Sequence, residues 1–463
     1  MSKQMNTSNK HTLVCAALLS ALGATSQAQA GDAKNVILFI GDGMGPTVLT
    51  ATRLFKVGEE GNLDMMKLPR TARIKTFSHD AQTTDSAPSM AAYTTGVKMN
   101  NEVIAMSSDT KAIAPGKDVN GNKTVNNCSS DNGKPVPTIL ELAKAAGKSV
   151  GAVTTTELTH ATPAATYSHI CHRDAAYDIA AQAVPGGAGF NSALKDGVDV
   201  LMGGGANHWT PYSASNKGGR NDNRDLTAEM TAQGYSYVTT QSDLAKVTSG
   251  KVLGLFSSKS HLDYELDRVA KGAANTQPSL SEMTAKAIDL LSQNSQGYFL
   301  MVEGGRIDHA LHGTNAKRAL TDAVALDEAV KTALGKVDLN NTLIVVTADH
   351  DHTMTINGYA AKGNPVLDLV KNGDGSTQND VDGKPFTTLV FGNGPNRADV
   401  RPVLTSDQVM ANDYLQETGV KLASETHGGG DVMLFADGAG SNRFKGTLDN
   451  TKVFGKLREA LGL

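Results

Sequence analysis

Cysteine is scarce in this sequence, and the three cysteines present, Cys15, Cys128 and Cys171, lie far apart. None belongs to the tight Cys-x-x-Cys spacing that is typical of cysteine metal sites, so a metal held by a cysteine pair is not expected. Cys15 lies in a short apolar run near the N-terminus, which leaves the other two for the folded protein. The sequence leaves two states open for this pair, one disulfide or two buried thiols.

A strong charge of one sign is also lacking. The 43 lysines and arginines nearly balance the 47 aspartates and glutamates, and the formal net charge is −4. This composition lacks the basic footprint expected of a protein that binds nucleic acid or an anionic membrane surface. Hydrophobic residues at 40% and 47 glycines are typical of a globular protein with many tight loops.

No apolar run is long enough to cross a membrane stably. The run LVCAALLSALGA follows a polar N-terminal stretch and precedes Ala28-Gln29-Ala30, which fits an A-x-A cleavage site. We therefore expect residues 1–30 to be a signal peptide, the mature chain to begin at Gly31, and the protein to be periplasmic or secreted. A retained N-terminal anchor is the alternative.

Strand and helix patterns alternate along the rest of the chain. Strands are expected at Asn35–Ile40, Ser149–Thr154, Val198–Met202, Val252–Phe256, Tyr298–Val302, Thr342–Val346, Thr387–Phe391 and Val432–Phe435, and helices at Thr138–Ala146, Arg173–Val184, Ser279–Gln293, Ala316–Val337 and Lys452–Leu461. This alternation predicts an α/β three-layer sandwich, with a central, mostly parallel sheet flanked by helices. We expect residues 31–463 to form a single domain, with residues 357–424, richer in Gly, Asn and Asp, as an inserted cap or crown.

Ligands of open α/β sheets bind beyond the carboxyl ends of the strands, so the residues that follow each strand carry most information. Asp42 follows the first strand between glycines. No Lys-Ser/Thr pair comes after these glycines, which excludes a P-loop, and Asp42 alone is equally consistent with a turn. The stretch DHDH, residues 349–352, follows another strand, and its two carboxylates and two imidazoles favour a divalent cation over a solvated loop.

The stretch EGGRIDHALH, Glu303 to His312, follows a third expected strand. Asp308 and His312 are four residues apart, so on a helix both side chains point from one face and can grip one ion. Glu303, at the strand end, need not share that ion. His427 stands alone beside glycines in THGGGD, and it becomes a candidate ligand because the other clusters lack a third protein ligand.

Ser86, in the stretch TTDSAPS, is the candidate nucleophile. The alanines and proline that follow it favour a helix start, where free N–H groups stabilise an anion. A serine needs activation to attack, and no G-x-S-x-G elbow surrounds this one, so metal coordination is the remaining route. The competing interpretation is an N-cap serine without catalytic function.

Taken together, these segments resemble the alkaline phosphatase family. The matching segments are IGDGMG (Ile40–Gly45), TTDSAPS (Thr83–Ser89), TTTELTHATPAA (Thr154–Ala165), VEGGRIDHALHG (Val302–Gly313), TADHDH (Thr347–His352) and THGGGD (Thr426–Asp431), together with PSLSEMTAKAIDLLS. They run in order over most of the expected mature chain, and their joint occurrence is specific although each segment alone is not.

The resemblance implies three metal sites and two catalytic residues. It implies that one zinc is held by Asp308, His312 and His427, a second by Asp42, Asp349 and His350, and a magnesium by Asp42, Thr162 and Glu303. Ser86 is then the nucleophile, and Arg173 matches the arginine that grips phosphate oxygens bidentately.

Several residues depart from one branch of the family or stay open. His160 and His309 are expected beside the third ion and match animal members, whereas some bacterial members have Asp and Lys there, so magnesium, zinc and cobalt all remain candidates for that ion. Ser257 stands where animal members usually have a glutamate of a calcium site, so that site is not expected. His352 is either a neighbour of the zinc or a surface-loop histidine, and Arg306 is expected to be structural.

The resemblance implies a secreted homodimeric phosphatase that hydrolyses phosphate monoesters through a phosphoserine, with an alkaline optimum. A sulfatase or a phosphodiesterase of the same superfamily is the first alternative. Ser86-Ala87-Pro88 matches the start of a sulfatase motif, but the arginine that should follow is replaced by Met90, and a diesterase would usually lack the third-site residues Thr162 and Glu303. An exported protein that binds metal or phosphate without turnover is the second alternative.

Overall fold

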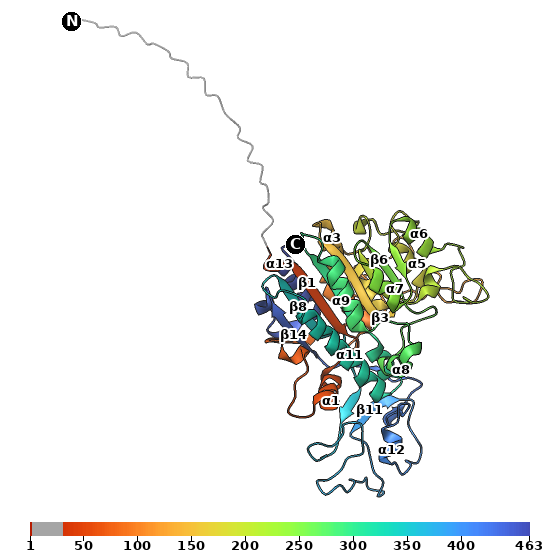
Figure 1. The fold of residues 1–463 in the computed structure, drawn as a ribbon, viewed down its shortest axis with the longest axis vertical. Helices are drawn as coiled ribbons and strands as arrows, with labels where there is room; N and C mark the ends of the chain where they lie inside the picture. The colour runs from red at the N-terminus through yellow and green to blue at the C-terminus, as the bar shows by residue number, and fades with distance from the viewer. Residues whose placement is uncertain (2–30) are drawn as a thin grey trace.

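The computed structural model describes Met1 and residues 31–463 (Figure 1). The expected signal peptide and its cleavage site fall on residues 2–30, which lie outside the described part of the chain. Within the described part, no helix has both the length and the apolar character that a membrane crossing requires.

A ten-stranded sheet forms the centre of the molecule, in the order β15-β2-β14-β8-β1-β7-β3-β4-β6-β5. These strands are β1 (Asn35–Gly41), β2 (Arg70–Lys75), β3 (Ser149–Glu157), β4 (Val200–Gly204), β5 (Ser236–Val238), β6 (Val252–Leu255), β7 (Tyr298–Gly304), β8 (Thr342–Ala348), β14 (Val432–Gly438) and β15 (Gly446–Asp449). Only β14 pairs antiparallel within this sheet, with β2 and β8. The continuous apolar sequences of β1, β7 and β8 are buried almost throughout, as in strands covered on both faces. The predicted, mostly parallel sheet is confirmed.

Helices cover both faces of the sheet. The helices of the described chain are α1 (Pro46–Val57), α2 (Ser86–Thr95), α3 (Ile139–Ala145), α4 (Ala161–Tyr167), α5 (Ala176–Gln182), α6 (Leu226–Ala232), α7 (Gln241–Lys246), α8 (Glu265–Ala270), α9 (Leu280–Leu291), α10 (Arg306–His312), α11 (Ala316–Leu334), α12 (Ser406–Val409), which lies outside the main sheet, and α13 (Asn450–Leu461). Helix α11 packs against α1, α8, α9 and α10, whereas α2 packs against α4 and α13, and α3 contacts that second group. Figure 1 shows α9 and α11 along one side of β1 and β3. The three-layer architecture is therefore confirmed.

Two predicted helices differ from those observed by three residues at one end. The helix expected at 173–184 begins only at Ala176, and the N–H of Arg173 donates to the carbonyl of Glu102 at 2.8 Å. The helix expected at 316–337 ends at Leu334, and Gly335 caps it. The first difference matters for the site, because it places Arg173 in a loop.

A second, smaller sheet lies outside the main one. It consists of β10 (Met354–Ile356), β11 (Leu389–Gly394) and β12 (Thr418–Lys421). The strand expected at 387–391 therefore begins two residues later, as β11, and joins this sheet. Two short strands, β9 (Asp351–His352) and β13 (His427–Gly428), pair with each other next to the main sheet. The segment around β11 and α12 lies at one end of the molecule (Figure 1, bottom), and its interpretation as an inserted cap stays a prediction.

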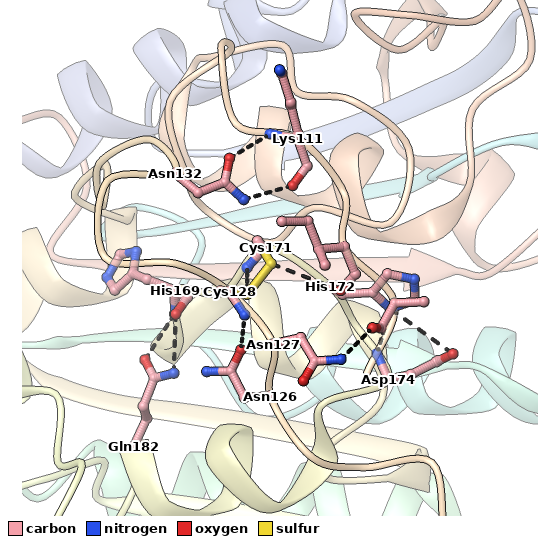
Figure 2. The surroundings of a disulfide bond; sticks show 12 residues. Lys111, Asn126, Asn127, Cys128, Asn132, His169, Cys171, His172, Asp174 and Gln182 are labelled. Atoms are coloured by element: carbon pink, nitrogen blue, oxygen red, sulfur yellow. Dashed lines mark hydrogen bonds and ion pairs between the residues drawn. A yellow bond between two sulfur atoms is a disulfide. The ribbon is translucent and has the colours of Figure 1, made fainter. Parts of the chain in front are cut away.

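The cysteine pair forms a disulfide. Cys128 and Cys171 are joined, and the N–H of Cys171 also donates to Cys128 Sγ at 3.2 Å. Figure 2 shows how this bond ties the loop that contains Asn126 and Asn127 to the segment that carries His169 and His172. Of the two states left open by the sequence, the structure adopts the disulfide. Arg173 follows two residues after Cys171, so the loop that carries it is covalently anchored.

Candidate active site

The carboxyl ends of β1, β7 and β8 gather three of the predicted acidic residues. Glu303 pairs with the penultimate residue of β1, and the last residues of β1 and β8 pair with each other. Asp42 and Asp349 directly follow those last residues, so three carboxylates meet at one sheet edge. All three side chains are fully buried. The register of three parallel strands thus builds a crowded acidic edge.

Ser86 is the first residue of α2, and it faces this edge. Asp85 caps the helix, because its Oδ1 accepts a hydrogen bond from the N–H of Ala87 at 2.7 Å. The alternative interpretation of Ser86 as the N-cap is therefore wrong. Its Oγ lies 3.2 Å from Nε2 of His350 and 3.4 Å from Oδ1 of Asp42. The free N–H groups of the first helical turn make this position favourable for an anion.

Asp308, His312, His352 and His427 form a first cluster, in which one ligand atom from each lies within 4.8 Å of the others. Asp308 and His312 lie four residues apart on α10, as predicted. Asp308 Oδ1 is 3.3 Å from Nε2 of both His312 and His427. The two Nε2 atoms face each other at 3.1 Å.

Backbone carbonyls determine the tautomers of these two histidines. His312 Nδ1 lies 2.6 Å from the carbonyl oxygen of Glu425, and His427 Nδ1 lies 2.8 Å from that of Thr84. Because a carbonyl only accepts, each Nδ1 carries the proton and each Nε2 keeps its lone pair. Two lone pairs and a carboxylate oxygen that converge on one point suit a zinc ion.

His352 belongs to the first cluster and is not a surface-loop histidine. It is 2% exposed, with Nε2 at 2.8 Å from Asp308 Oδ1 and Nδ1 at 2.6 Å from Glu425 Oε2. Burial opposes its protonation, but the hydrogen bonds that it donates to these two carboxylates raise the pKa of His352 to about 10. At neutral pH the ring therefore donates from both nitrogens, and it holds Asp308 in place.

Asp42, Asp349 and His350, predicted as a second cluster, also come together. His350 Nε2 is 3.2 Å from Asp42 Oδ1 and 3.4 Å from Asp349 Oδ2. The Oδ2 atoms of both aspartates are buried without a hydrogen-bond partner among the described residues. Asp308 approaches this group as well, with 3.9 Å between its Oδ1 and His350 Nε2. The first and second clusters are therefore adjacent.

A third cluster consists of Asp42, His160 and Glu303. Thr154 Oγ1 donates to Glu303 Oε2 at 2.5 Å. In the described part of the chain, Glu303 Oε1, Thr162 Oγ1 and His160 Nδ1 are buried and lack a hydrogen-bond partner. Buried polar atoms of this kind are costly unless an ion or water satisfies them. Of the residues predicted for the third site, Asp42 and Glu303 therefore come together, and His160 joins them.

The charges of this edge call for cations. Burial raises the pKa of Asp42 well above its usual value, and the charges of Asp349 and Asp308 add to this. Burial likewise raises the pKa of Glu303 to about 7. Burial also opposes ionisation of Asp308, but the hydrogen bond from His352 lowers its pKa well below the usual range. Repulsion among buried carboxylates is what divalent cations neutralise, so the residues present fit such ions.

Arg173 reaches the site from the loop before α5. Its Nη1 is 3.0 Å from Asp85 Oδ1 and its Nη2 is 2.9 Å from His160 Nε2. Asp85 thus caps α2 and anchors Arg173, which couples the position of the arginine to that of Ser86. Arg173 also lines a cleft of about 470 Å³ together with Glu102, Lys123, Glu157, His160 and His208.

His160 and His309, expected beside the third ion, lie close together with ring centroids 5.2 Å apart. His261 lies beside both rings, with its centroid 4.2 Å from that of His309 and 5.6 Å from that of His160. Burial lowers the pKa of His309 to about 4 and that of His261 to about 2, so both rings are neutral. Arg306 donates to His309 Nδ1 at 2.9 Å and lies 3.7 Å above the ring of Tyr264, which fits the structural role expected for it.

The sequence analysis did not assign Asp85, Glu425 and His261. Asp85 stands directly before a predicted helix start, and this position is the sequence signal of an N-cap. Glu425 and His261 carry no such local signal, because their partners lie far away along the chain. His352 and His312, for example, are 73 and 113 positions from Glu425.

Comparison with known proteins shows that this chain belongs to the hydrolases of phosphate monoesters. The family model for alkaline phosphatase matches residues 33–463. The chain belongs to the alkaline phosphatase family, as the sequence motifs indicated.

Individual relatives agree with this assignment. The chain is 40% identical to the tissue-nonspecific alkaline phosphatase of Gallus gallus over 439 residues, which cover 88% of this chain and 80% of that protein. The structure of Thermus thermophilus alkaline phosphatase is 26% identical, with a TM-score of 0.68, and covers 97% of this chain and 96% of that one. A mutant of TAB5 alkaline phosphatase with Mg bound in the M3 site is 26% identical, with a TM-score of 0.65 and coverage of 94% and 99%.

Proposed function

We propose that this protein is an alkaline phosphatase that converts phosphate monoesters to an alcohol and inorganic phosphate through a covalent phosphoserine on Ser86. One observation carries the proposal. Ser86 Oγ, at the N-terminus of α2, lies 3.2 Å from Nε2 of His350 and 3.4 Å from Oδ1 of Asp42. His350 belongs to the second cluster, and Asp42 belongs to both the second and the third. A serine in this position has the activation that an isolated hydroxyl lacks.

Two zinc ions and one magnesium ion complete the proposed centre. The first zinc would be held by Asp308, His312 and His427, the second by Asp42, Asp349 and His350, and the magnesium by Asp42, Thr162 and Glu303, with His160 and His309 beside it. The Mg in the M3 site of the TAB5 mutant supports a third ion. When bound, such ions stabilise a serine alkoxide and a departing oxygen and activate a water molecule.

The residues of the chain carry out two displacements. After its hydroxyl proton is lost to solvent, Ser86 Oγ bonds to phosphorus while the ester oxygen leaves and takes up a proton as the alcohol. Arg173, oriented by Asp85 and His160, binds two phosphoryl oxygens through its planar fork. A water oxygen then bonds to phosphorus, the bond to Ser86 breaks, and the serine is protonated again as inorganic phosphate leaves.

Replacement of the nucleophile tests the mechanism. Ser86→Ala is expected to lower kcat for a nitrophenyl phosphate monoester by at least about 10⁴-fold. It should also abolish the acid-stable phosphoserine that quenching of the wild-type protein traps. Ser292→Ala, at the exposed end of α9, is the matched control and should keep both. Full activity of Ser86→Ala would exclude the mechanism, and faster turnover of a nitrophenyl diester or sulfate would favour the other activities of the superfamily.

Export and assembly as a homodimer belong to the same proposal. The Cys128–Cys171 disulfide supports an oxidising compartment. Tyr359, Val400 and Val403 expose large apolar side chains, and this supports residues 357–424 as a cap that meets a second copy. Mass spectrometry should find a mature chain that begins at Gly31, and light scattering should give twice the mass of one chain.

A further inference from the structure

Glu425 contacts the first cluster through both its main chain and its side chain. Its carbonyl oxygen lies 2.6 Å from Nδ1 of His312, and its carboxylate oxygen Oε2 lies 2.6 Å from Nδ1 of His352. The residue is 1% exposed, so water does not compete for these contacts. One residue therefore orients two imidazoles of the same cluster.

The carboxylate of Glu425 is itself held in one orientation. Its Oε1 accepts hydrogen bonds from the N–H of Thr353 at 2.7 Å and from the hydroxyl of Thr353 at 2.6 Å. Strands β9 and β13 pair at this point, with His352 opposite His427. Glu425 thus connects the chain just before His427 to the strand that carries His352.

The ring of His352 is confined on its other side by Gly43. A Cβ atom built on Gly43, which has φ +67°, would lie 2.4 Å from Cδ2 and 2.5 Å from Nε2 of His352. Gly43 therefore lies against Cδ2 and Nε2 of the ring, where a side chain would have no room, and Nδ1 is bonded to Glu425. Between them they direct Nε2 at Oδ1 of Asp308, 2.8 Å away.

We propose that Glu425 is a positioning residue for the zinc of the first cluster, and that its side chain acts through His352 on Asp308. Asp308 then presents Oδ1 to the point where His312 and His427 converge. Removal of a residue that hydrogen-bonds to a metal ligand and orients it typically weakens metal binding 10–100-fold. The inference rests on the metal assignment of the proposed function.

Zinc retention in a double-mutant cycle tests the inference. Wild type, Glu425→Ala, His352→Ala and the double variant are titrated with a chromophoric zinc chelator at fixed pH and saturating magnesium, and bound zinc is measured by atomic emission. Glu425→Ala should raise the dissociation constant of one zinc per chain about 10–100-fold. In the His352→Ala background the same substitution should cost less than about 3-fold, because the connection to Asp308 is already missing.

Glu141→Gln is the matched control. Glu141 is also a buried glutamate that bonds a histidine, His169, at 2.7 Å, but none of its hydrogen-bond partners belongs to the three clusters. It should lower the melting temperature and leave zinc affinity unchanged. Glu425→Gln keeps an acceptor for His352 and should show an intermediate loss, and it replaces Glu425→Ala in the cycle if the alanine variant does not fold.

Three outcomes would overturn the inference. These are wild-type zinc affinity in the Glu425 variants, an equal loss in both His352 backgrounds, and a zinc loss in Glu141→Gln as large as that in Glu425→Gln. The last result would mean that zinc escapes through general destabilisation. A wild-type protein that binds no zinc would instead contradict the proposed function, so the two failures can be told apart.

Discussion

The two sides of the site owe their rigidity to different interactions. On one side, the edge of β1, β7 and β8 crowds Asp42, Glu303 and Asp349 together, and several of their oxygens have no partner in the described part of the chain. On the other side, the segment that carries Arg173 is held entirely by bonds within the protein. Arg173 pairs with Asp85, and the Cys128–Cys171 disulfide lies just before it.

This difference separates two tasks. The acidic edge attains a stable charge state only with protons or cations, so its geometry depends on ions. The Arg173 segment is organised before any ion or substrate arrives, because its backbone pairs with Glu102 and Ile104 and its neighbour His169 bonds Glu141. We therefore expect metals to control catalysis and the Arg173 segment to control phosphate affinity, and each side should respond to its own perturbation.

Metal removal should break the acidic side and have the largest effect. Dialysis against EDTA should abolish turnover, and zinc with magnesium should restore it.

Burial raises the pKa of Glu303 from 4.5 to about 7. In the metal-free protein the carboxyl of Glu303 ionises at lower pH in the unfolded chain than in the folded one. The free energy of unfolding therefore falls as pH rises from about 4.5 to 7, by an amount on the order of 3 kcal/mol. Calorimetry from pH 5 to pH 8 should show this fall only without metals, and apo stability that rises over this range would contradict the prediction.

Loss of the disulfide should weaken the other side without touching the metals. Cys128 and Cys171 are 43 residues apart, and closure of a loop of that length in the unfolded chain predicts a loss of about 4 kcal/mol. The double variant Cys128→Ser/Cys171→Ser avoids a stray thiol. Its melting temperature should fall, while bound zinc per chain stays at the wild-type value. Wild type treated with a phosphine reductant should approach the variant, and zinc loss in both would show that the two sides are not independent.

The sequence predicted the helices and strands that a local residue pattern identifies. Strands such as β1 and β8 are continuous apolar runs, and α9 begins with the capping box of Ser279 and Glu282. Strand β2 was missed, because RTARIK buries only Ala72 and Ile74 and alternates with charged residues. Strand β15, at the sheet edge, is shorter still, with only four residues. Their position depends on pairing with distant strands, which local pattern does not report.

The same limit applies to the site. Asp42, Asp349 and Glu303 were predictable because each lies at the end of a buried strand, where the topology gathers side chains. Glu425 and His261 were not, since only the folded chain brings them to their partners. The sequence does not decide whether His352 is a neighbour of the zinc or a surface-loop histidine, because the stretch TADHDH does not distinguish a buried imidazole from an exposed one.

Asp85 offers the smallest and sharpest perturbation, because none of the groups that donate to its carboxylate belongs to the three clusters. Asp85→Asn keeps a side chain that caps α2 but removes the charge that holds Arg173 at 3.0 Å. Misplacement of the arginine should lower kcat/KM and weaken phosphate inhibition by about 10–100-fold, with zinc content unchanged. Asp449→Asn, at the equivalent capping position of α13, is the control and should leave both constants at wild-type values. If Asp85→Asn instead lost zinc, Ser86 and its cap would belong to the metal-dependent side, and the division between the two sides would have to be redrawn through α2.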